Sequence, residues 1–232
     1  MNLLAVDTTA DACSAAILMQ DGRIHERCIV EPRGHTRHLL PMARELTHAT
    51  GLSLSDMDAL AFGRGPGSFT GLRIATGVVQ GLAWGLSLPV VPVSSLATVA
   101  AGAIRQHGLS DGSGIAVAFD ARMGEVYWGC FVQRDGLPEP VSQECVVAPE
   151  SVTLPAGDGR PWFGAGSGWR LSDQFPASVS QTMEACYPDR IPHAADIARL
   201  ALGPAESGQG VPAEEAIPVY IRDEVAWKKS GS

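Results

Sequence analysis

The chain has 232 residues, a formal net charge of −8 and 45% hydrophobic residues, enough apolar content for one large domain or two small lobes with separate cores. Its only lysines are Lys228 and Lys229, so the body of the chain lacks the lysine of a phosphate-binding P-loop or of Schiff-base chemistry. The acidic balance also argues against unaided binding to nucleic acid, because positive charge supplies most of that affinity.

The cysteines and the N-terminus bear on the cellular compartment. Five cysteines occur, an odd number without a C-x-x-C pair, which favours free thiols in a reducing compartment over a disulfide framework or a zinc site. The start has no basic region and Asp7 interrupts its apolar run, so no signal peptide is expected. No apolar segment reaches about 18 residues, the length of a membrane span. We therefore expect a cytoplasmic protein without membrane contact.

The first half of the chain predicts a three-strand meander and then alternating helices and strands. Asp21-Gly22 is a hairpin turn signal, and Pro41 fits a helix only in its first turn. The predicted strands are residues 2–6, 13–19, 24–30, 59–62 and 89–93, and the predicted helices are 39–50, 70–86 and one that runs from Ser94 or Ser95 through residue 104.

Glycines are concentrated in the loop and helix at the centre of this half. Residues 63–73 read G-R-G-P-G-S-F-T-G-L-R, and Gly77, Gly81 and Gly85 follow at intervals of four. The loop lacks the G-K-[ST] of a P-loop, so a tight turn is favoured over a phosphate site. Each helical glycine costs about 1 kcal/mol relative to alanine. The shared face of the three glycines therefore predicts close packing, either within this lobe or with a partner.

The second half repeats part of this pattern. After a polar linker, a strand ends in Asp120, a second strand follows, and Asp135-Gly136 marks another hairpin turn. Asp7 precedes Asp21 by 14 residues and Asp120 precedes Asp135 by 15, which indicates an internal repeat, with chance hairpins as the alternative. The predicted elements are strands 115–119, 125–132, 144–147 and 161–168, a helix around 197–201, a loop at 203–212, and a docking tail at 220–227.

These elements predict two α/β lobes with mixed sheets, residues 1–108 and 109–232, the second being reduced and carrying the tail. The cleft between the lobes would lie near the turns after Asp7 and Asp120. Paired acids of this kind occur in actin, sugar kinases and heat-shock ATPases. Asp7, Thr8, Thr9 and Asp120 are therefore candidates for nucleotide binding, with a turn-forming aspartate as the alternative for Asp7.

Other chemistry has little support in the sequence. His35 and His38 lie three residues apart, but no third ligand has a suitable spacing, so we interpret them as solvated polar residues at a helix start. No G-x-S-x-G motif occurs, which argues against a serine hydrolase. We therefore expect no metal site.

Five segments in order resemble the bacterial TsaB (YeaZ) family, and the resemblance spans nearly the whole chain. They are V-D-T-T at 6–9, L-L-P-M at 39–42, G-R-G-P-G-S-F-T-G-L-R-I-A at 63–75, D-A-R-M-G-E-V-Y-W at 120–128 and Y-I-R-D-E-V-A-W-K-K at 220–229. The resemblance implies an actin-like ATPase fold (ASKHA, ribonuclease H-like). It also implies a role in threonylcarbamoylation of the adenosine next to the anticodon, in tRNAs that read codons starting with A.

The resemblance further implies a non-catalytic scaffold that works with the catalytic TsaD and the ATPase TsaE. A homodimer is expected when the chain is alone, tRNA contact only through the complex, and ATP or ADP only in the complex. The metal-binding His-x-x-x-His pair of the catalytic relative falls at Ser95 and Val99 here, neither of which replaces imidazole. The expected partner interface comprises Leu39, Met42, Leu46, Phe69, Thr70, Arg73, Gly77, Gly81 and Gly85.

Two rival functions stay open at this point. A small-molecule kinase or ATPase would use Asp7 and Asp120 and would bind nucleotide in the isolated chain. A metallopeptidase would need metal ligands that the sequence does not supply.

Overall fold

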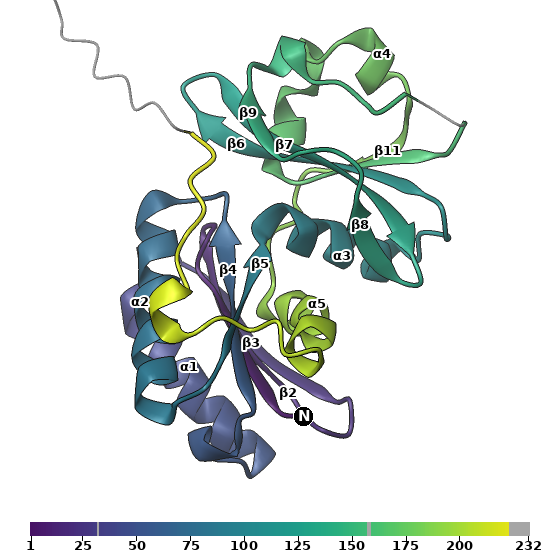
Figure 1. Cartoon of the computed structure of the whole chain (residues 1–232). Coiled ribbons are helices and arrows are strands. Elements are labelled where there is room, and N and C mark those ends of the chain that lie inside the picture. Colours follow the sequence, from purple (N-terminus) through teal and green to yellow (C-terminus); the bar gives the residue numbers. More distant parts are fainter. Residues whose placement is uncertain (32, 157–158, 223–232) are drawn as a thin grey trace, which may run out of the picture.

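The computed structural model describes residues 1–31, 33–156 and 159–222. The chain forms two lobes, each built on one mixed β-sheet with helices packed against it (Figure 1). None of the helices in the described ranges combines the length and the apolar character needed to cross a bilayer.

The first sheet has five strands in the order β3-β2-β1-β4-β5. The first three are antiparallel, and β4 and β5 run parallel to β1. Strands β1 and β2 are buried along their whole length, which is why their sequences are apolar on both faces. The strands are β1 (Leu3–Asp7), β2 (Ala12–Leu18), β3 (Ile24–Val30), β4 (Ala59–Gly65) and β5 (Val90–Ser94).

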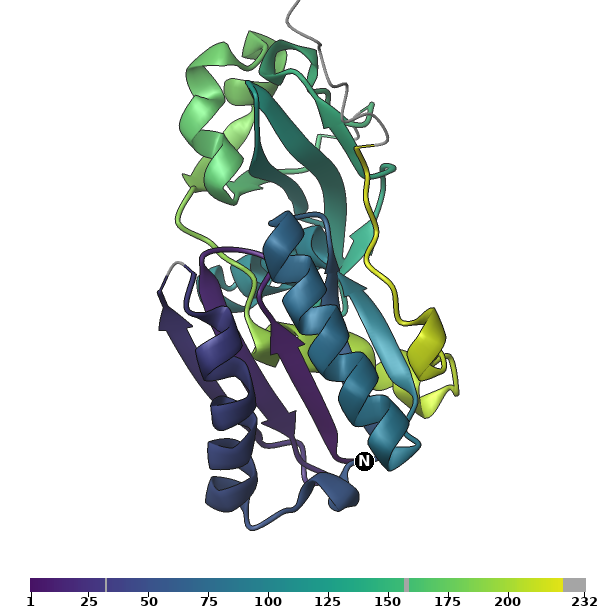
Figure 2. The ribbon, with the colours of Figure 1, turned by 90° about the vertical axis from the view of Figure 1, so that its left-hand side faces the viewer.

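Helices cover both faces of this sheet. Helices α1 (His35–Thr50) and α2 (Phe69–Leu86) lie side by side on one face, as Figure 2 shows. Helix α5 (Ala194–Glu206) packs on the opposite face, where Ile197 and Ala201 meet apolar residues of β1 and β2. Two short 3-10 turns, η1 (Leu54–Asp56) and η4 (Ala213–Glu215), complete this lobe.

The second sheet follows the order β11-β10-β6-β7-β8, and β9 also pairs with β7. Strands β6, β7 and β8 form the antiparallel part, and β10 and β11 run parallel to β6. The topology of the first sheet is therefore repeated, which confirms the predicted internal repeat. The strands are β6 (Gly114–Arg122), β7 (Glu125–Arg134), β8 (Leu137–Pro140), β9 (Cys145–Val147), β10 (Trp162–Ala165) and β11 (Met183–Tyr187).

Helix α3 (Ser95–His107) and a set of short turns cover the second sheet. Helix α3 lies on the face toward the first lobe (Figure 1). The opposite face packs an aromatic cluster in which Trp128, Trp169 and Phe175 lie with ring centroids 5.1–5.9 Å apart. The short elements are η2 (Pro149–Ser151), η3 (Ser167–Gln174) and α4 (Ala177–Ser180). This pair of like sheets is the two-lobed actin-like fold that the sequence predicts, with small helices in the second lobe.

The predicted lobe ranges, 1–108 and 109–232, need correction for two helices. Helix α3 lies before the predicted boundary, yet its apolar side is part of the core of the second sheet. Helix α5 lies after the boundary, yet it covers the first sheet. The chain then continues along the first lobe, where Val211 bridges to Val90. The lobe to which each helix belongs is therefore decided by the apolar surface that the helix buries, and not by its order in the sequence.

Three local predictions are also wrong. Pro41 lies inside α1, beyond its first turn. The helix therefore continues through a residue that has no backbone N–H to donate. The third strand of the second meander is β8, directly after the Asp135-Gly136 turn, and residues 145–147 form the additional strand β9. The expected loop at 203–212 begins as the last turn of α5.

Candidate functional site

The glycine-rich loop after β4 packs directly on the turn between β1 and β2. A Cβ on Gly63 would lie 2.1 Å from Asp7 Oδ2, and one on Gly71 would lie 1.8 Å from the carbonyl oxygen of Thr8. The backbone N–H of Ser68 donates to the carbonyl of Thr9 at 2.7 Å. Glycine is required here because two stretches of backbone touch, and this contact fixes where α2 begins.

Asp7, Thr8 and Thr9 are buried in this contact. The Asp7 carboxylate, 1% exposed, accepts hydrogen bonds from the backbone N–H and the hydroxyl of Thr9 at 2.9 and 3.0 Å, while the Thr8 hydroxyl donates to the Gly71 carbonyl at 2.6 Å. Burial raises the pKa of Asp7 to about 7 although the Thr9 hydrogen bonds oppose the shift. The prediction that these side chains face an open cleft is wrong, and Asp7 is the turn-forming aspartate of the alternative interpretation.

Asp120 stands in the equivalent position of the second lobe but lies at the surface. Its carboxylate accepts from the backbone N–H of Arg122 at 2.8 Å and pairs with the Arg122 guanidinium at 3.3 Å. Its backbone N–H donates a hydrogen bond to the Ser167 hydroxyl at 3.2 Å. The structure therefore does not present Asp7 and Asp120 as two exposed acids.

The three glycines of α2 face solvent. Gly77, Gly81 and Gly85 are exposed, and a Cβ on any of them would meet no atom of the described residues within 4 Å. Trp84 lies between them in the helical repeat and is 75% exposed. Packing within the chain's own lobe is therefore excluded for this face over the described ranges. We refer to Gly77, Gly81, Trp84 and Gly85 as the glycine ridge.

Phe69, Thr70 and Arg73 lie at the N-terminal end of α2 and are also exposed. The Arg73 guanidinium sits 3.8 Å above the centre of the Phe69 ring, a cation–π arrangement. The Tyr220 ring centroid is 5.6 Å from that of Phe69, and the Arg73 Nε donates to the Tyr220 hydroxyl at 3.4 Å. The start of α2 is thereby joined to the end of the described chain.

Leu39, Met42 and Leu46 do not belong to an exposed interface. They are 1%, 8% and 0% exposed and pack into the core between α1 and the first sheet. Their prediction as partner contacts is therefore wrong, because the apolar periodicity of α1 marks the face that meets its own sheet. Leu40, 47% exposed, is a large apolar residue that α1 presents to solvent.

Trp84 and Leu40 are the surface residues that the sequence analysis missed. The signal for Trp84 was its spacing, since it lies three residues after Gly81 and precedes Gly85. No comparable signal marked Leu40, which is adjacent to the buried Leu39.

The C-terminal strap, residues 217–222, crosses from the first lobe to the second (yellow in Figure 1). The backbone N–H of Val219 donates to the Arg64 carbonyl at 2.8 Å. At its far end, Arg222 pairs with Glu125 and contacts the Met123 sulfur at 3.6 Å. The predicted docking tail, 220–227, thus docks over 220–222, and its remainder, 223–227, lies outside the described residues.

A cavity of about 490 Å³ opens between the lobes under this strap. The Ser94 hydroxyl, which caps α3, donates to the Glu144 carboxylate there. Burial raises the pKa of Glu144, and the Ser94 hydrogen bond and the Arg64 charge oppose the shift. The cavity is lined by Arg64, Ser94, Ala97, Phe131, Pro140, Gln143, Glu144, Val219, Tyr220 and Ile221.

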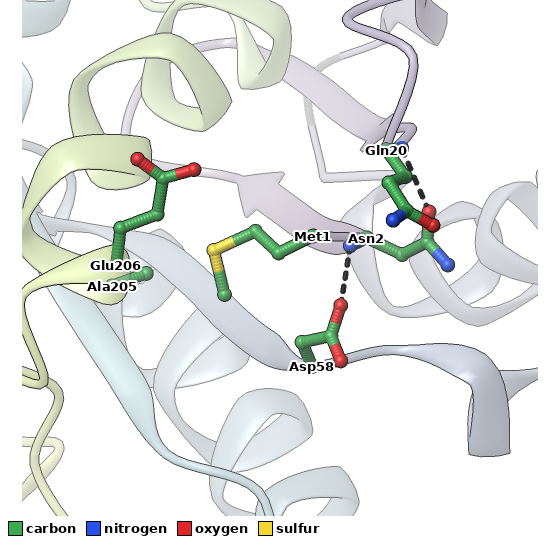
Figure 3. Close-up of a pocket in the computed structure, with 6 residues that line it drawn as sticks. All are labelled: Met1, Asn2, Gln20, Asp58, Ala205 and Glu206. Carbon is green, nitrogen blue, oxygen red and sulfur yellow. Dashed lines mark hydrogen bonds between the residues drawn. The ribbon is translucent and has the colours of Figure 1, made fainter.

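A second cavity, about 520 Å³, lies at the opposite end of the first lobe beside the start of β1 (Figure 3). The backbone N–H of Asn2 donates to Asp58 at 2.6 Å, and that of Gln20 donates to the Asn2 side chain at 2.9 Å. Met1, Ala205 and Glu206 complete its lining. These hydrogen bonds join chain segments of the lobe, and no predicted site residue lies here.

Ser95 and Val99 are the residues that the resemblance sets at the positions of the histidine pair of the catalytic relative. Ser95 is fully buried, and Val99 packs in the core between α3 and the second sheet. Across residues 1–31, 33–156 and 159–222, no three side chains of the metal-ligating types histidine, cysteine, aspartate or glutamate come together.

Known proteins resemble the chain in sequence over nearly its full length. The family model described as TsaD, tRNA N6-adenosine threonylcarbamoyltransferase, matches residues 30–228. The tRNA threonylcarbamoyladenosine biosynthesis protein TsaB of Escherichia coli K12 is 41% identical, covering 99% of this chain and 98% of its own. The TsaB protein of Haemophilus influenzae is 36% identical, with 99% and 97% covered.

The chain belongs to the TsaB family. Solved structures agree: YeaZ from Pseudomonas aeruginosa is 47% identical with a TM-score of 0.88, covering 94% of this chain and 99% of its own. A second Pseudomonas aeruginosa structure, described as similar to peptidase YEAZ, is 46% identical with a TM-score of 0.89, covering 95% and 99%. The family resemblance predicted from the five sequence segments is thus confirmed.

Proposed function

We propose that this chain acts in the cytoplasm as a non-catalytic subunit in threonylcarbamoyladenosine biosynthesis on tRNA. It binds the catalytic TsaD protein through the glycine ridge, and TsaE joins the complex. The family membership supports the pathway, because its curated members carry that name. The observation that carries the binding role is the row of three exposed helical glycines with open space above them.

The energetics of the ridge favour a partner. Three helical glycines cost about 3 kcal/mol relative to alanine, and no contact among the described residues uses the space they leave. A helix backbone approaching from outside would use it, because the absence of Cβ atoms permits close contact. The indole of Trp84 adds a large apolar surface at the same place. When TsaD is absent, a second copy of the chain would cover the same ridge.

The polar residues that were candidates for a catalytic site are buried or already paired within the chain. Asp7 lies under the glycine-rich loop and its oxygens accept from Thr9, and Asp120 pairs with Arg122. Ser95 and Val99, which are expected to match the histidines of the catalytic relative, are buried. These positions support a division of labour in which chemistry, ATP or ADP and tRNA contact belong to the assembled complex.

Reconstitution tests this role. TsaD, TsaE, the threonylcarbamoyl-adenylate synthase, ATP, threonine, bicarbonate and tRNA are combined with and without this chain, and modified adenosine is measured by mass spectrometry. We expect product only when the chain is present. Undiminished product in its absence would refute the proposal, and nucleotide turnover by the chain alone would favour the kinase or ATPase alternative.

Gly81→Leu tests the surface. A Cβ at residue 81 meets no atom of the described residues within 4 Å, so the fold should persist while product formation and TsaD binding fall about tenfold or more, because the added side chain holds the partner backbone away. Gly203→Leu is the matched control, since Gly203 is also an exposed helical glycine with open space, on α5 across the sheet. Equal activity of the two variants would show that the ridge is not the binding surface.

A further inference from the structure

Helices α3 and α5 pack against each other where the two lobes join (Figure 1). The apolar residues of α3 belong to the core of the second sheet, and those of α5 belong to the core of the first. The contact between the two helices is therefore a contact between the lobes. It lies across the first sheet from the glycine ridge, so the proposed TsaD-binding role does not account for it.

Asp196 is the acidic residue of α5 that reaches α3. It lies in the first turn of α5, and its side chain is 1% exposed. The guanidinium of Arg105 on α3 donates to both oxygens of the carboxylate, Nε to Oδ1 at 3.0 Å and Nη2 to Oδ2 at 3.1 Å. This pair fixes direction as well as distance, because a planar guanidinium matches a planar carboxylate in one geometry.

Arg199 binds the same carboxylate from within α5. Its Nη1 donates to Asp196 Oδ1 at 3.0 Å and to the carbonyl of Ala195 at 3.1 Å. The two arginines therefore compensate one buried charge but differ in what they connect. Arg199 stays on its own helix, whereas Arg105 joins a helix of one lobe to a helix of the other.

A glycine on α3 makes room for this contact. Gly102 is buried and lies three residues before Arg105, on the same side of the helix. A Cβ on Gly102 would lie 3.0 Å from Asp196 Oδ2, so a larger residue would crowd the carboxylate. Glycine lowers the stability of a helix interior, and the room that it leaves for Asp196 accounts for its place here.

The pair lies near two of the places where the chain passes between the lobes. One crossing is at Ser94, where β5 ends and α3 follows, and another is the segment 188–193 between β11 and α5. Asp196 lies in the first turn after the second crossing, and Arg105 lies about 16 Å along the α3 axis from Ser94. A rotation of the lobes about these crossings would therefore separate Arg105 from Asp196.

A buried ion pair is better suited to fixing an orientation than to adding stability. The desolvation of the two charges offsets much of their attraction, so apolar residues in their place can give an equally stable protein. Apolar contact is non-directional, however, and lets two helices rotate against each other. The charged pair favours one arrangement, because any other leaves Oδ2 of Asp196 buried without its donor.

We propose that the Arg105–Asp196 pair is an interlobe lock, which holds the two lobes at one angle. While the pair is formed, α3 and α5 keep one crossing geometry and the cavity under the strap keeps its walls. When the pair is broken, the second lobe rotates about Ser94 and the segment 188–193. The lock belongs to the chain itself and operates whether or not TsaD binds the glycine ridge.

Distances between spin labels on the two lobes test the lock in the full chain. The labels are attached at Ala49→Cys on α1 and at Glu184→Cys on β11, two exposed positions, and the distance distribution is measured by double electron–electron resonance. The reference chain also carries serine in place of the accessible cysteines, which are Cys28, Cys145 and Cys186.

Arg105→Ala and Arg199→Ala are a matched pair, because each removes one guanidinium from the same carboxylate. Arg105→Ala should broaden the distance distribution about twofold, since the lobes then adopt more than one angle. Arg199→Ala should leave the distribution as it is in the reference chain. If the arginines only compensated a buried charge, both variants would lower the melting temperature and neither would change the distribution. A reference-like distribution in folded Arg105→Ala, or equal broadening in both variants, would overturn the proposal.

Arg105→Lys keeps the lock testable if Arg105→Ala does not fold. Lysine retains the positive charge but lacks the planar fork that binds both oxygens. The distribution should therefore broaden again, while circular dichroism shows a folded chain. A distribution as narrow as that of the reference chain would show that the geometry of the Arg105 pair does not set the angle, and the proposal would be wrong.

Discussion

The carboxyl group of Asp7 lies at the end of β1, where it holds the β1–β2 turn through Thr9 and supports the glycine-rich loop at Gly63. Burial raises its pKa from 3.8 to about 7. The folded chain therefore retains this proton at pH values where the unfolded chain has released it. The free energy of unfolding should therefore depend on pH through the titration of this one residue.

Asp7→Asn should remove this dependence. Because the folded carboxyl has the higher pKa, its contribution is present at low pH and is lost as the pH rises through about 7. The free energy of unfolding of the wild type, measured with urea, should therefore be roughly 3 kcal/mol lower at pH 8 than at pH 5 because of this carboxyl group. The asparagine variant should lack that part of the slope.

Asp120→Asn is the control for this measurement, since Asp120 holds the equivalent place in the second lobe but is exposed. Its pH slope should match the wild type. If Asp7→Asn retained the full wild-type slope, Asp7 would not titrate near neutral pH and the account of its burial would be wrong.

Among the elements, helix α2 contains two kinds of glycine that have opposite effects on stability. At Gly71 an added Cβ would lie 1.8 Å from a backbone oxygen, whereas at Gly77 it would meet nothing within 4 Å of the described residues. The first glycine is required by the fold. The second lowers the stability of the isolated helix and leaves its backbone accessible.

The pair Gly71→Ala and Gly77→Ala tests this contrast by urea unfolding. Gly71→Ala should lower the free energy of unfolding by about 3 kcal/mol, because the backbone of Thr8 must move. Gly77→Ala should raise it by about 1 kcal/mol, because alanine is the better helix former and meets no obstacle. A loss of stability in Gly77→Ala would mean that the ridge packs against something in the free chain.

The sequence predicted the elements whose periodicity and turn signals agree. Strands β1 to β3 follow from apolar runs joined by Asp21-Gly22, and α2 follows from its loop and helical spacing. Strand β8 was missed because it is four residues long and contains Pro138 and Pro140, which are poor strand signals. The last turn of α5 was missed because Gly203 and Pro204 are typical of loops.

The candidate site could be predicted only in part. The glycine spacing identified the ridge, but a glycine face packed within the lobe would have the same pattern, and only the fold shows that it is open. The α1 residues Leu39, Met42 and Leu46 were assigned to the partner because sequence does not distinguish a face buried in the chain from one buried in a complex.

For the whole molecule, the strap is the connection that joins the N-terminal end of α2 to the second lobe. Tyr220 contacts Phe69 and Arg73 at one end, and Arg222 pairs with Glu125 at the other. The strap also lines the cavity between the lobes. A change in how the lobes are oriented would therefore require the strap to move.

Arg222→Ala should release the far end of the strap. We expect amide hydrogen exchange at residues 219–221 to accelerate about fivefold, which corresponds to about 1 kcal/mol, because the half-buried ion pair with Glu125 is lost. Exchange within β1 and β4 should not change. Mass spectrometry of exchanged peptides measures both.

Arg170→Ala is the matched control, since the side chains of Arg170 and Asp189 are 62% and 79% exposed and such pairs contribute little. It should change neither exchange nor melting temperature. If the two variants behaved alike, the Arg222 pair would have no role in holding the strap.

The packing of α5 on the first sheet determines when the first lobe can finish folding during synthesis. Strand β5 ends at Ser94 and α5 begins at Ala194, so about 100 residues must be made before the uncovered side of the first sheet has its helix, a wait of roughly 5 to 20 s at bacterial rates of synthesis. Throughout that time Leu3, Ala5 and Leu18 have no covering helix. The first lobe is thus translated first, but its core is completed last. We expect chaperones that bind nascent chains to bind this apolar surface.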